Sequence, residues 1–179
     1  KAIVQTTFAD ANNYMKDGVL LRQVINVIDE LDFSDYEESH AFGEIYETIL
    51  KELQSAGSAC EFYTPRAVTD FMAQVIKPQI GEIMADFACG TGGFIVSWLK
   101  ELKKLVNTTE DEETYSNSIY GIEKKQFPYM LCVTNLLLHG LDVPQVYHSN
   151  TLLHDVLDYT ESDKVDVILM NPPYGGSEK

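Results

Sequence analysis

Two short segments hold residue types that could bind a small ligand and act on a second molecule. The first, residues 86–94 (DFACGTGGF), begins with an acid, ends in a glycine-rich stretch and follows a short apolar run. Glycines allow positive φ angles and let a ligand approach the backbone closely. The segment lacks the Gly-Lys-Ser/Thr of a P-loop and the third glycine of the dinucleotide fingerprint. Because Asp86 would repel a pyrophosphate, the segment fits a ligand carrying an ammonium and a sulfonium better, and an NAD enzyme is disfavoured.

The second segment, Asn171-Pro172-Pro173-Tyr174, follows another apolar run. An exocyclic amine on a nucleobase is a poor nucleophile because its lone pair is delocalised into the ring. The Asn171 side-chain oxygen and the Pro172 carbonyl can accept the N–H bonds of such an amine and localise that lone pair. The consecutive prolines fix the backbone, and the Tyr174 ring can stack on a flipped-out base. This chemistry needs no metal. The Cys and His residues are scattered without the spacing of metal ligands, so no metal site is expected.

The elements that position these segments alternate between strand and helix. Continuous apolar strands separated by helices predict an α/β fold with a mainly parallel, doubly wound sheet covered on both faces. The expected strands are residues 82–88, 118–122, 145–148 and 165–170, and the expected helices between them are residues 92–106 and 126–139. Ligands bind at the carboxyl ends of the strands in such sheets, so we expect both segments to lie there. Glu123 follows the second strand, where a carboxylate can accept hydrogen bonds from ribose hydroxyls.

Helical periodicity also precedes the sheet. Apolar residues at the helical spacing predict two helices with an irregular acidic linker between them. In order, these segments are residues 19–31, 33–39 and 40–56. A third helix is expected to begin with Thr64 as its N-cap and Pro65 as its first residue. The acidic residues 107–117 (NTTEDEETYSN) are expected to form a solvated loop.

These patterns predict two parts, a helical N-terminal segment of residues 1–57 and an α/β core of residues 58–179. The chain stops five residues after Tyr174, so we expect the core to be incomplete at its C-terminus and the chain to be a fragment. No apolar run approaches the roughly 20 residues of a membrane helix, and no secretory leader is visible. A soluble, cytoplasmic protein is therefore expected.

The two segments and the acid between them resemble a known family. D-x-A-C-G-T-G-G-F followed by Glu123 resembles motifs I and II of the class I (Rossmann-like) methyltransferases, which implies S-adenosyl-L-methionine as the cofactor. Residues 61–66 (EFYTPR) resemble motif X of the γ-type N6-adenine DNA methyltransferases, above all the modification (M) subunit of type I restriction–modification systems. In that family this segment closes over the methionine end of the cofactor. Asn150, in the segment HSNTL, matches the third motif, and the implied contact is with the cofactor adenine.

The resemblance covers residues 40–179 and implies a role for each matching residue. The implied cofactor-binding residues are Glu61, Phe62, Tyr63, Thr64, Pro65, Arg66, Asp86, Ala88, Gly90, Thr91, Gly92, Gly93, Phe94, Glu123 and Asn150. The implied catalytic residues, which hold and activate a flipped adenine, are Asn171, Pro172, Pro173 and Tyr174.

The implied activity is methyl transfer from S-adenosylmethionine to adenine N6 in DNA, as the modification subunit of a type I restriction–modification complex. The chain has 28 acidic and 13 basic residues and a formal net charge of −15, whereas affinity for nucleic acid comes largely from Lys and Arg contacts to phosphates. The segment alone is therefore expected to bind DNA poorly. The resemblance implies that DNA is held mainly through a separate specificity (S) subunit, and that a restriction and translocase (R) subunit is a further partner.

Two alternatives stay open at this point. The NPPY sequence also occurs in enzymes that methylate a glutamine side chain of translation release factors, so it does not by itself select adenine. The fold could also belong to an assembly subunit that has lost catalysis. A carbon-5 cytosine methyltransferase would instead need a Pro-Cys nucleophile at this strand end, and none follows residues 165–170.

Overall fold

The computed structural model describes residues 2–9, 11–30, 36–55, 64–153 and 155–173. The α-helices are α1 (Ala2–Thr7), α2 (Gly18–Asp29), α3 (Tyr36–Ser55), α4 (Arg66–Ile76), α5 (Gly93–Lys103), α6 (Thr109–Ser116) and α7 (Gln126–Leu138). The strands are β1 (Met84–Asp86), β2 (Ile119–Glu123), β3 (Val146–His148) and β4 (Val167–Ile168). Three short 3-10 helices lie between β3 and β4: η1 (Thr151–Leu153), η2 (Val156–Asp158) and η3 (Glu161–Asp163).

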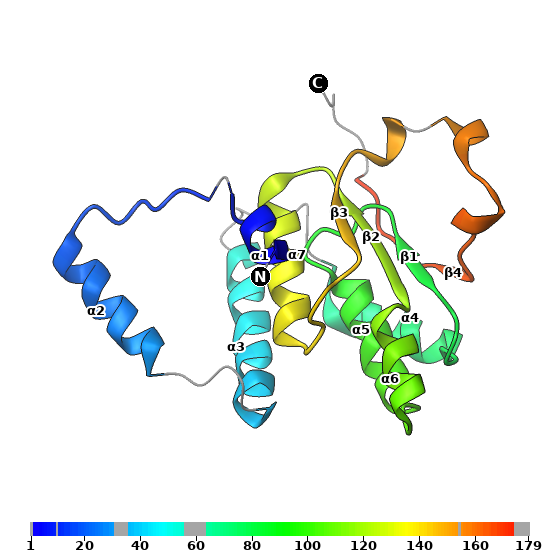
Figure 1. Cartoon of the computed structure of the whole chain (residues 1–179), viewed down its shortest axis with the longest axis horizontal. Helices are drawn as coiled ribbons and strands as arrows, with labels where there is room; N and C mark the ends of the chain where they lie inside the picture. Colours follow the sequence, from blue (N-terminus) through cyan, green and yellow to red (C-terminus); the bar gives the residue numbers. More distant parts are fainter. Residues whose placement is uncertain (1, 10, 31–35, 56–63, 154, 174–179) are drawn as a thin grey trace.

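The four strands form one parallel sheet in the order β3-β2-β1-β4 (Figure 1). Ala85 is in register with Tyr120 of β2 on one side and with Ile168 of β4 on the other. The predicted α/β class with a parallel sheet is therefore confirmed. All four strands are shorter than or shifted from their expected bounds, but each of them lies within one residue of the expected segment.

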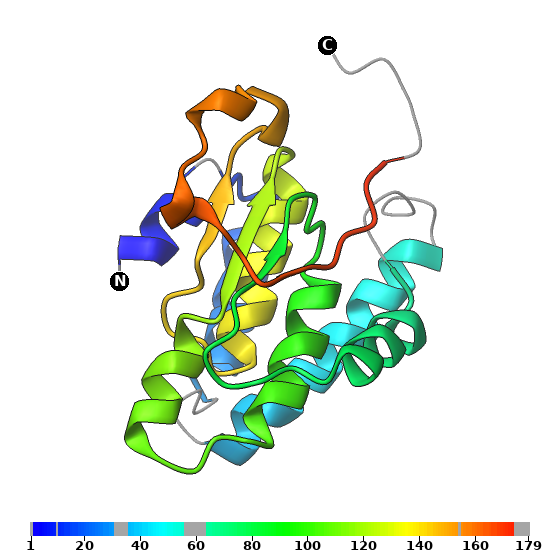
Figure 2. The same cartoon turned by 90° about the vertical axis from the view of Figure 1, so that its right-hand side faces the viewer.

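Helices α5 and α7 cover one face of this sheet, and α3 and α4 form an outer layer against them (Figure 2). A side chain added at Gly121 would lie 3.1 Å from Ile95 of α5, so this residue faces the helices. Its neighbour Tyr120 points to the opposite face, where Tyr120, Tyr147 and Ile168 are 36%, 46% and 54% exposed. In the described part of the chain, helices therefore cover one face of the sheet. The expected helical cover of the opposite face is not found among these residues.

The core lies between the sheet and the two helices that cover it. Trp98, Ile95, Leu99 and Leu102 of α5 are almost completely buried, and Met84 of β1 packs in the same cluster. Burying an aliphatic side chain of this size stabilises the fold by about 1.5–3 kcal/mol. This packing holds β1, and with it the segment that follows β1, in a fixed place.

The acidic segment expected to be a loop is in fact helix α6, with the 3.1 Å bond from the Asp111 amide to the Thr108 hydroxyl at its start. The Asp111 carboxylate accepts the Thr108 amide in return at 2.9 Å, which completes a capping box. Acids in the first turn also favour the positive end of the helix dipole. The expected linker is likewise wrong in part, because residues 36–39 belong to α3.

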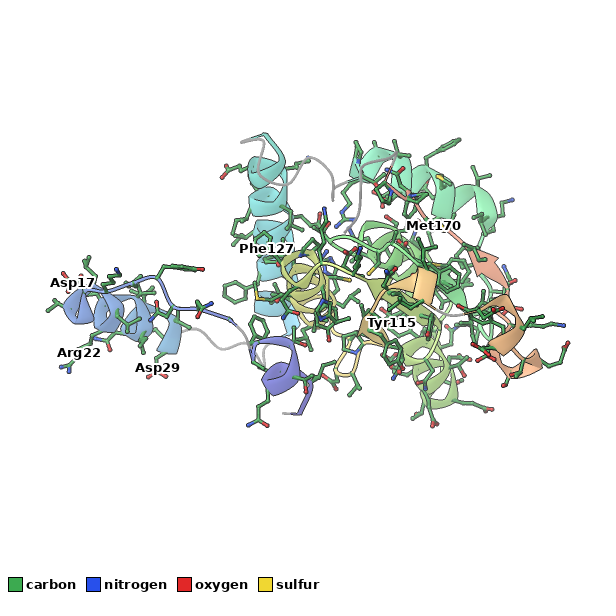
Figure 3. All side chains as sticks on the ribbon, turned by 90° about the horizontal axis from the view of Figure 1, so that it is seen from above. Asp17, Arg22, Asp29, Tyr115, Phe127 and Met170 are labelled. Atoms are coloured by element: carbon green, nitrogen blue, oxygen red, sulfur yellow. The ribbon has the colours of Figure 1, made fainter. Side chains whose placement is uncertain are left out.

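The N-terminal helices differ in how they contact the rest of the molecule. Helix α1 packs on α7, where the Gln126 side chain donates to the Thr7 carbonyl at 3.1 Å. Helix α2 has no buried residue and projects away from the body, and Figure 3 shows Asp17, Arg22 and Asp29 along it. The predicted domain boundary after residue 57 falls outside the described residues and stays a prediction. None of the described helices is long and apolar enough to cross a bilayer.

The capping box of α6 generates a stability prediction. Replacing Thr108 by alanine removes the acceptor for the Asp111 amide, so we expect the free energy of unfolding to fall by about 1 kcal/mol. Thr109→Ala is the matched control, because Thr109 is also exposed but is the first residue inside the helix. Urea denaturation of the two variants measures the difference. Equal stabilities of both variants would contradict the role of the cap.

Candidate active site

Asp86 is the last residue of β1 and is almost completely buried, with 1% of its surface exposed. Its carboxylate accepts the Ala88 amide at 3.1 Å. Burial away from water is the main cause that raises the pKa of the Asp86 carboxyl to about 7, and the nearby charge of Glu123 adds to it. A carboxylate in this setting is stabilised by any cation that comes close to it.

Glu123 is the last residue of β2 and lies beside the glycine-rich turn. Its Oε2 accepts the Gly90 amide at 2.9 Å, and its Oε1 accepts the Lys125 amide at 2.8 Å. The side chain is 8% exposed. An ionised carboxylate has about four lone-pair sites, so two bonds to the backbone leave acceptor capacity for a ligand hydroxyl. The prediction that this acid stands at a strand end next to the loop is confirmed by β2.

The glycine-rich turn needs glycine for two separate reasons. Gly92 has a φ of 81°, in the left-handed region, and a Cβ added there would lie 2.8 Å from the Sγ of Cys132 on α7. A Cβ added at Gly93 would lie 2.6 Å from a guanidinium nitrogen of Arg66. The turn is therefore packed against two helices. Phe94, its last residue, is buried in the core.

The loop that follows β3 is tied to the same turn. The Thr151 hydroxyl donates to the Phe87 carbonyl at 2.7 Å, which connects the third strand end to the first. Asn150 uses its side-chain oxygen to accept the Leu152 amide at 3.1 Å. The predicted Asn150 thus lies at this edge of the sheet beside Thr151. Sequence reasoning missed Thr151, since a lone threonine in a turn carries no signal.

Asn171 lies three residues after β4, and its side-chain nitrogen donates to the Thr64 hydroxyl at 3.3 Å. This contact joins the EFYTPR segment to the NPPY segment, as the resemblance requires of two parts of one site. The expected start of the third helix is wrong by one residue, because α4 begins at Arg66 with Pro65 as its N-cap. The Thr64 hydroxyl is therefore not used as a helix cap. Residues 61–63 and Tyr174 lie outside the described residues.

Arg66 forms an ion pair with Glu47 of α3. The Asn135 side chain of α7 donates to Glu47 at 3.1 Å and to the Thr91 carbonyl of the glycine-rich turn at 3.0 Å. Glu47 and Asn135 were not among the predicted site residues. Nothing in the spacing of the sequence relates them to the turn, because the contacts join separate helices.

The two carboxylates at this edge, Asp86 and Glu123, favour a cationic ligand that also carries hydroxyl groups. Asp86 and Glu123 are neighbouring acids at the carboxyl ends of β1 and β2, and a phosphate group would be repelled by both. Because burial raises the pKa of Asp86, a nearby cationic group would stabilise its ionised form. The remaining acceptor capacity of Glu123 suits the hydroxyls of a ribose. These residues fit S-adenosylmethionine, whose methionine end is positively charged at the ammonium and the sulfonium.

The chain is similar to several curated proteins. It is 55% identical over 179 residues to the type I restriction enzyme EcoEI methylase subunit of Escherichia coli, over 99% of this chain and 36% of that relative. It is 30% identical over 162 residues to the MjaIX methylase subunit of Methanocaldococcus jannaschii, over 87% of this chain and 26% of that relative. The chain thus spans about a third of the length of these relatives.

Solved structures and a family profile agree with these similarities. A modification subunit from Vibrio vulnificus superposes with a TM-score of 0.85 at 44% identity, over 99% of this chain and 37% of that one. A chain from a type I R-M system superposes with a TM-score of 0.89 at 34% identity, over 99% and 37%. The profile of the N-6 DNA Methylase family matches residues 37–179. The chain therefore belongs to the N-6 DNA methylase family.

Proposed function

We propose that this chain forms the cofactor-binding and catalytic part of a DNA methyltransferase that modifies adenine N6 and uses S-adenosylmethionine. The observation that carries the proposal is the hydrogen bond between Asn171 and Thr64 at the sheet edge that also holds Asp86 and Glu123. It joins the segment expected to hold a base to the segment expected to cover a methyl donor. The family membership supports the same reaction.

The cofactor would supply a methyl group already activated on a sulfonium, so the protein has to bind and orient rather than to activate a nucleophile by a strong base. The negative charge of Asp86 favours the positive methionine end. Glu123 can accept the ribose hydroxyls with the lone pairs that Gly90 and Lys125 leave free. Asn150 and the segment around Thr64 complete the proposed binding site.

The side-chain amide of Asn171 is the first proposed acceptor for the target amine. Its Nδ2 donates to the Thr64 hydroxyl, and the proposed role of its Oδ1 is to accept an N–H bond of the target amine. The Pro172 carbonyl is the second proposed acceptor, and Pro172 and Pro173 are exposed. Two acceptors on one amine draw its lone pair out of the ring and aim it at the methyl group. Stacking of Tyr174 on the base stays a prediction.

We further propose that the chain acts as part of a modification subunit in a type I restriction–modification complex. Two curated relatives carry the name of type I methylase subunits, and one similar structure comes from a type I R-M system. A net charge of −15 disfavours DNA binding by this segment alone, since Lys and Arg contacts to phosphates dominate affinity, so the DNA-binding surface would come from the rest of the protein or from a partner chain. The proposed partners are a specificity subunit, which would bind the DNA, and a restriction and translocase subunit.

Replacing Asn171 by alanine tests the catalytic step. We expect methyl incorporation into DNA to fall by about 10²-fold or more, because one acceptor for the amine is lost. The Kd for S-adenosylmethionine, measured by calorimetry, should stay within about twofold, since the side chain holds the base and not the cofactor. Asn107→Ala, at an exposed site on another surface, is the control for both measurements. Loss of cofactor binding together with activity would show that Asn171 is structural.

The nature of the substrate is tested with the full-length protein and its specificity subunit. Labelled S-adenosylmethionine is incubated with DNA and with a translation release factor in parallel, and we expect label in DNA as N6-methyladenine. Label in the release factor alone would refute the proposal. Binding of cofactor with transfer to neither substrate would favour an assembly subunit without catalysis.

The raised pKa of Asp86 predicts a pH dependence of cofactor binding. In the free protein the carboxyl holds a proton below about pH 7, and a cationic ligand binds the ionised form. Protons and cofactor therefore compete, so each pH unit below 7 should weaken affinity by up to about tenfold, and affinity should level off at higher pH. Calorimetry between pH 5.5 and 8.5 measures this, and Asp86→Asn should flatten the profile. A flat profile in the unmodified protein would separate Asp86 from cofactor binding.

A further inference from the structure

The Asn135 side chain stands between two acceptors in the interior of the molecule. It is completely buried on α7, and its Nδ2 donates to the Glu47 carboxylate at 3.1 Å and to the Thr91 carbonyl at 3.0 Å. Because neither neighbour can donate, only the NH₂ end of the amide can face them. In the described part of the chain no donor reaches its Oδ1. A buried acceptor without a partner costs about 1–3 kcal/mol, so this arrangement is not explained by stability alone.

Glu47 connects this amide to the start of α4. Its Oε2 accepts the Arg66 Nε at 2.5 Å, and its Oε1 accepts a second guanidinium nitrogen of Arg66. The two side chains are only 12% and 15% exposed, so water screens this two-bond pair weakly. Arg66 follows Thr64 and Pro65 directly, and Thr64 is the partner of Asn171. One carboxylate on α3 therefore contacts both α4 and, through Asn135, the glycine-rich turn.

The same guanidinium also bounds the far end of the turn. A Cβ at Gly93 would come within 2.6 Å of Arg66, so the missing side chain is what lets the guanidinium lie against the first residue of α5. The turn is thus held at Thr91 by a hydrogen bond from Asn135, and the Arg66 guanidinium lies beside it at Gly93. Between these points lies Gly92, which has a positive φ and, as a glycine, has many other backbone conformations accessible when it is not held.

We infer that Glu47, Arg66 and Asn135 form a largely buried polar brace that positions the cofactor turn, and that cofactor affinity depends on it. This rests on the proposed function in taking S-adenosylmethionine as the ligand of the turn. The members of the brace are positioning residues, since they hold the Thr91 carbonyl and the backbone at Gly93 rather than the reacting atoms. A turn that is already ordered before binding loses less conformational freedom when the ligand arrives, and the affinity is higher for that reason.

The first test compares Asn135→Ala with Thr134→Val in the full-length protein. Thr134 lies one residue away on α7, where its hydroxyl donates to the Met130 carbonyl of the same helix and contacts Tyr46 of α3. For Asn135→Ala, which removes the bonds to Glu47 and to Thr91, we expect the Kd for S-adenosylmethionine to rise about tenfold, the size of the one bond that reaches the turn. The kcat at saturating cofactor should stay within about twofold. Thr134→Val should leave both quantities unchanged.

Hydrogen exchange of the ligand-free protein provides a readout that does not depend on the cofactor. Amides of residues 89–94 should exchange faster in Asn135→Ala than in the unmodified protein, while those of β2 should be unaffected. If the unmodified protein fails to bind S-adenosylmethionine, the proposed function is wrong, and the exchange rates still decide whether the brace orders the turn. A lower Tm with unchanged Kd and unchanged exchange would overturn the inference.

Glu47→Gln is the second variant, because it keeps the shape of the side chain and removes its charge. We expect it also to raise the Kd about tenfold, and the double variant with Asn135→Ala to raise it by about the same factor rather than about a hundredfold. Such non-additivity indicates that the two residues act through one interaction. Additive effects of the two substitutions would show that Glu47 and Asn135 act separately and would contradict a single brace.

Discussion

Parallel pairing of β1 with β2 on one side and with β4 on the other brings the ends of three strands to one edge of the sheet. Residues at these ends are far apart in the sequence, but the common direction of the strands makes them neighbours. Asp86, Glu123 and Asn171 all depend on this geometry for their positions. The helices α5 and α7 then keep the strands in place by burying one face. A change in the register of β1 would move Asp86 away from Glu123 and from the Asn171 amide.

The site is built from charges placed where water is scarce. Asp86 and Glu123 are both acids; Asp86 accepts the Ala88 amide, and Glu123 accepts the Gly90 and Lys125 amides. A positive ligand would relieve the cost of their burial, so part of the binding energy is stored in the free protein as an unfavourable arrangement of charge. In contrast, the Glu47–Arg66 pair is already neutral and gains nothing from a ligand. The first pair is suited to binding and the second to support.

The sequence was sufficient for those parts of the structure that depend on local pattern. Strand ends are marked by a change from apolar to polar residues, so Asp86, Glu123 and Asn171 could be placed at one edge. Helix α6 was missed because its acidic composition resembles a loop, although Thr108 and Asp111 carry the spacing of a capping box. Contacts that span 88 and 44 residues, from Asn135 to Glu47 and to Thr91, leave no trace in spacing or periodicity.

The Thr64–Asn171 hydrogen bond gives the two halves of the site a shared part. The Thr64 hydroxyl belongs to the segment expected to cover the methyl donor, and the Asn171 amide belongs to the segment expected to hold the base. If binding of one proposed substrate displaced Thr64, Asn171 would lose this partner, and displacement of Asn171 by the other substrate would affect Thr64 in the same way. By thermodynamic linkage, an effect of the first substrate on affinity for the second must be matched by an equal effect in the other direction. A substitution that removes this contact would therefore change the effect of each substrate on the affinity for the other by the same factor.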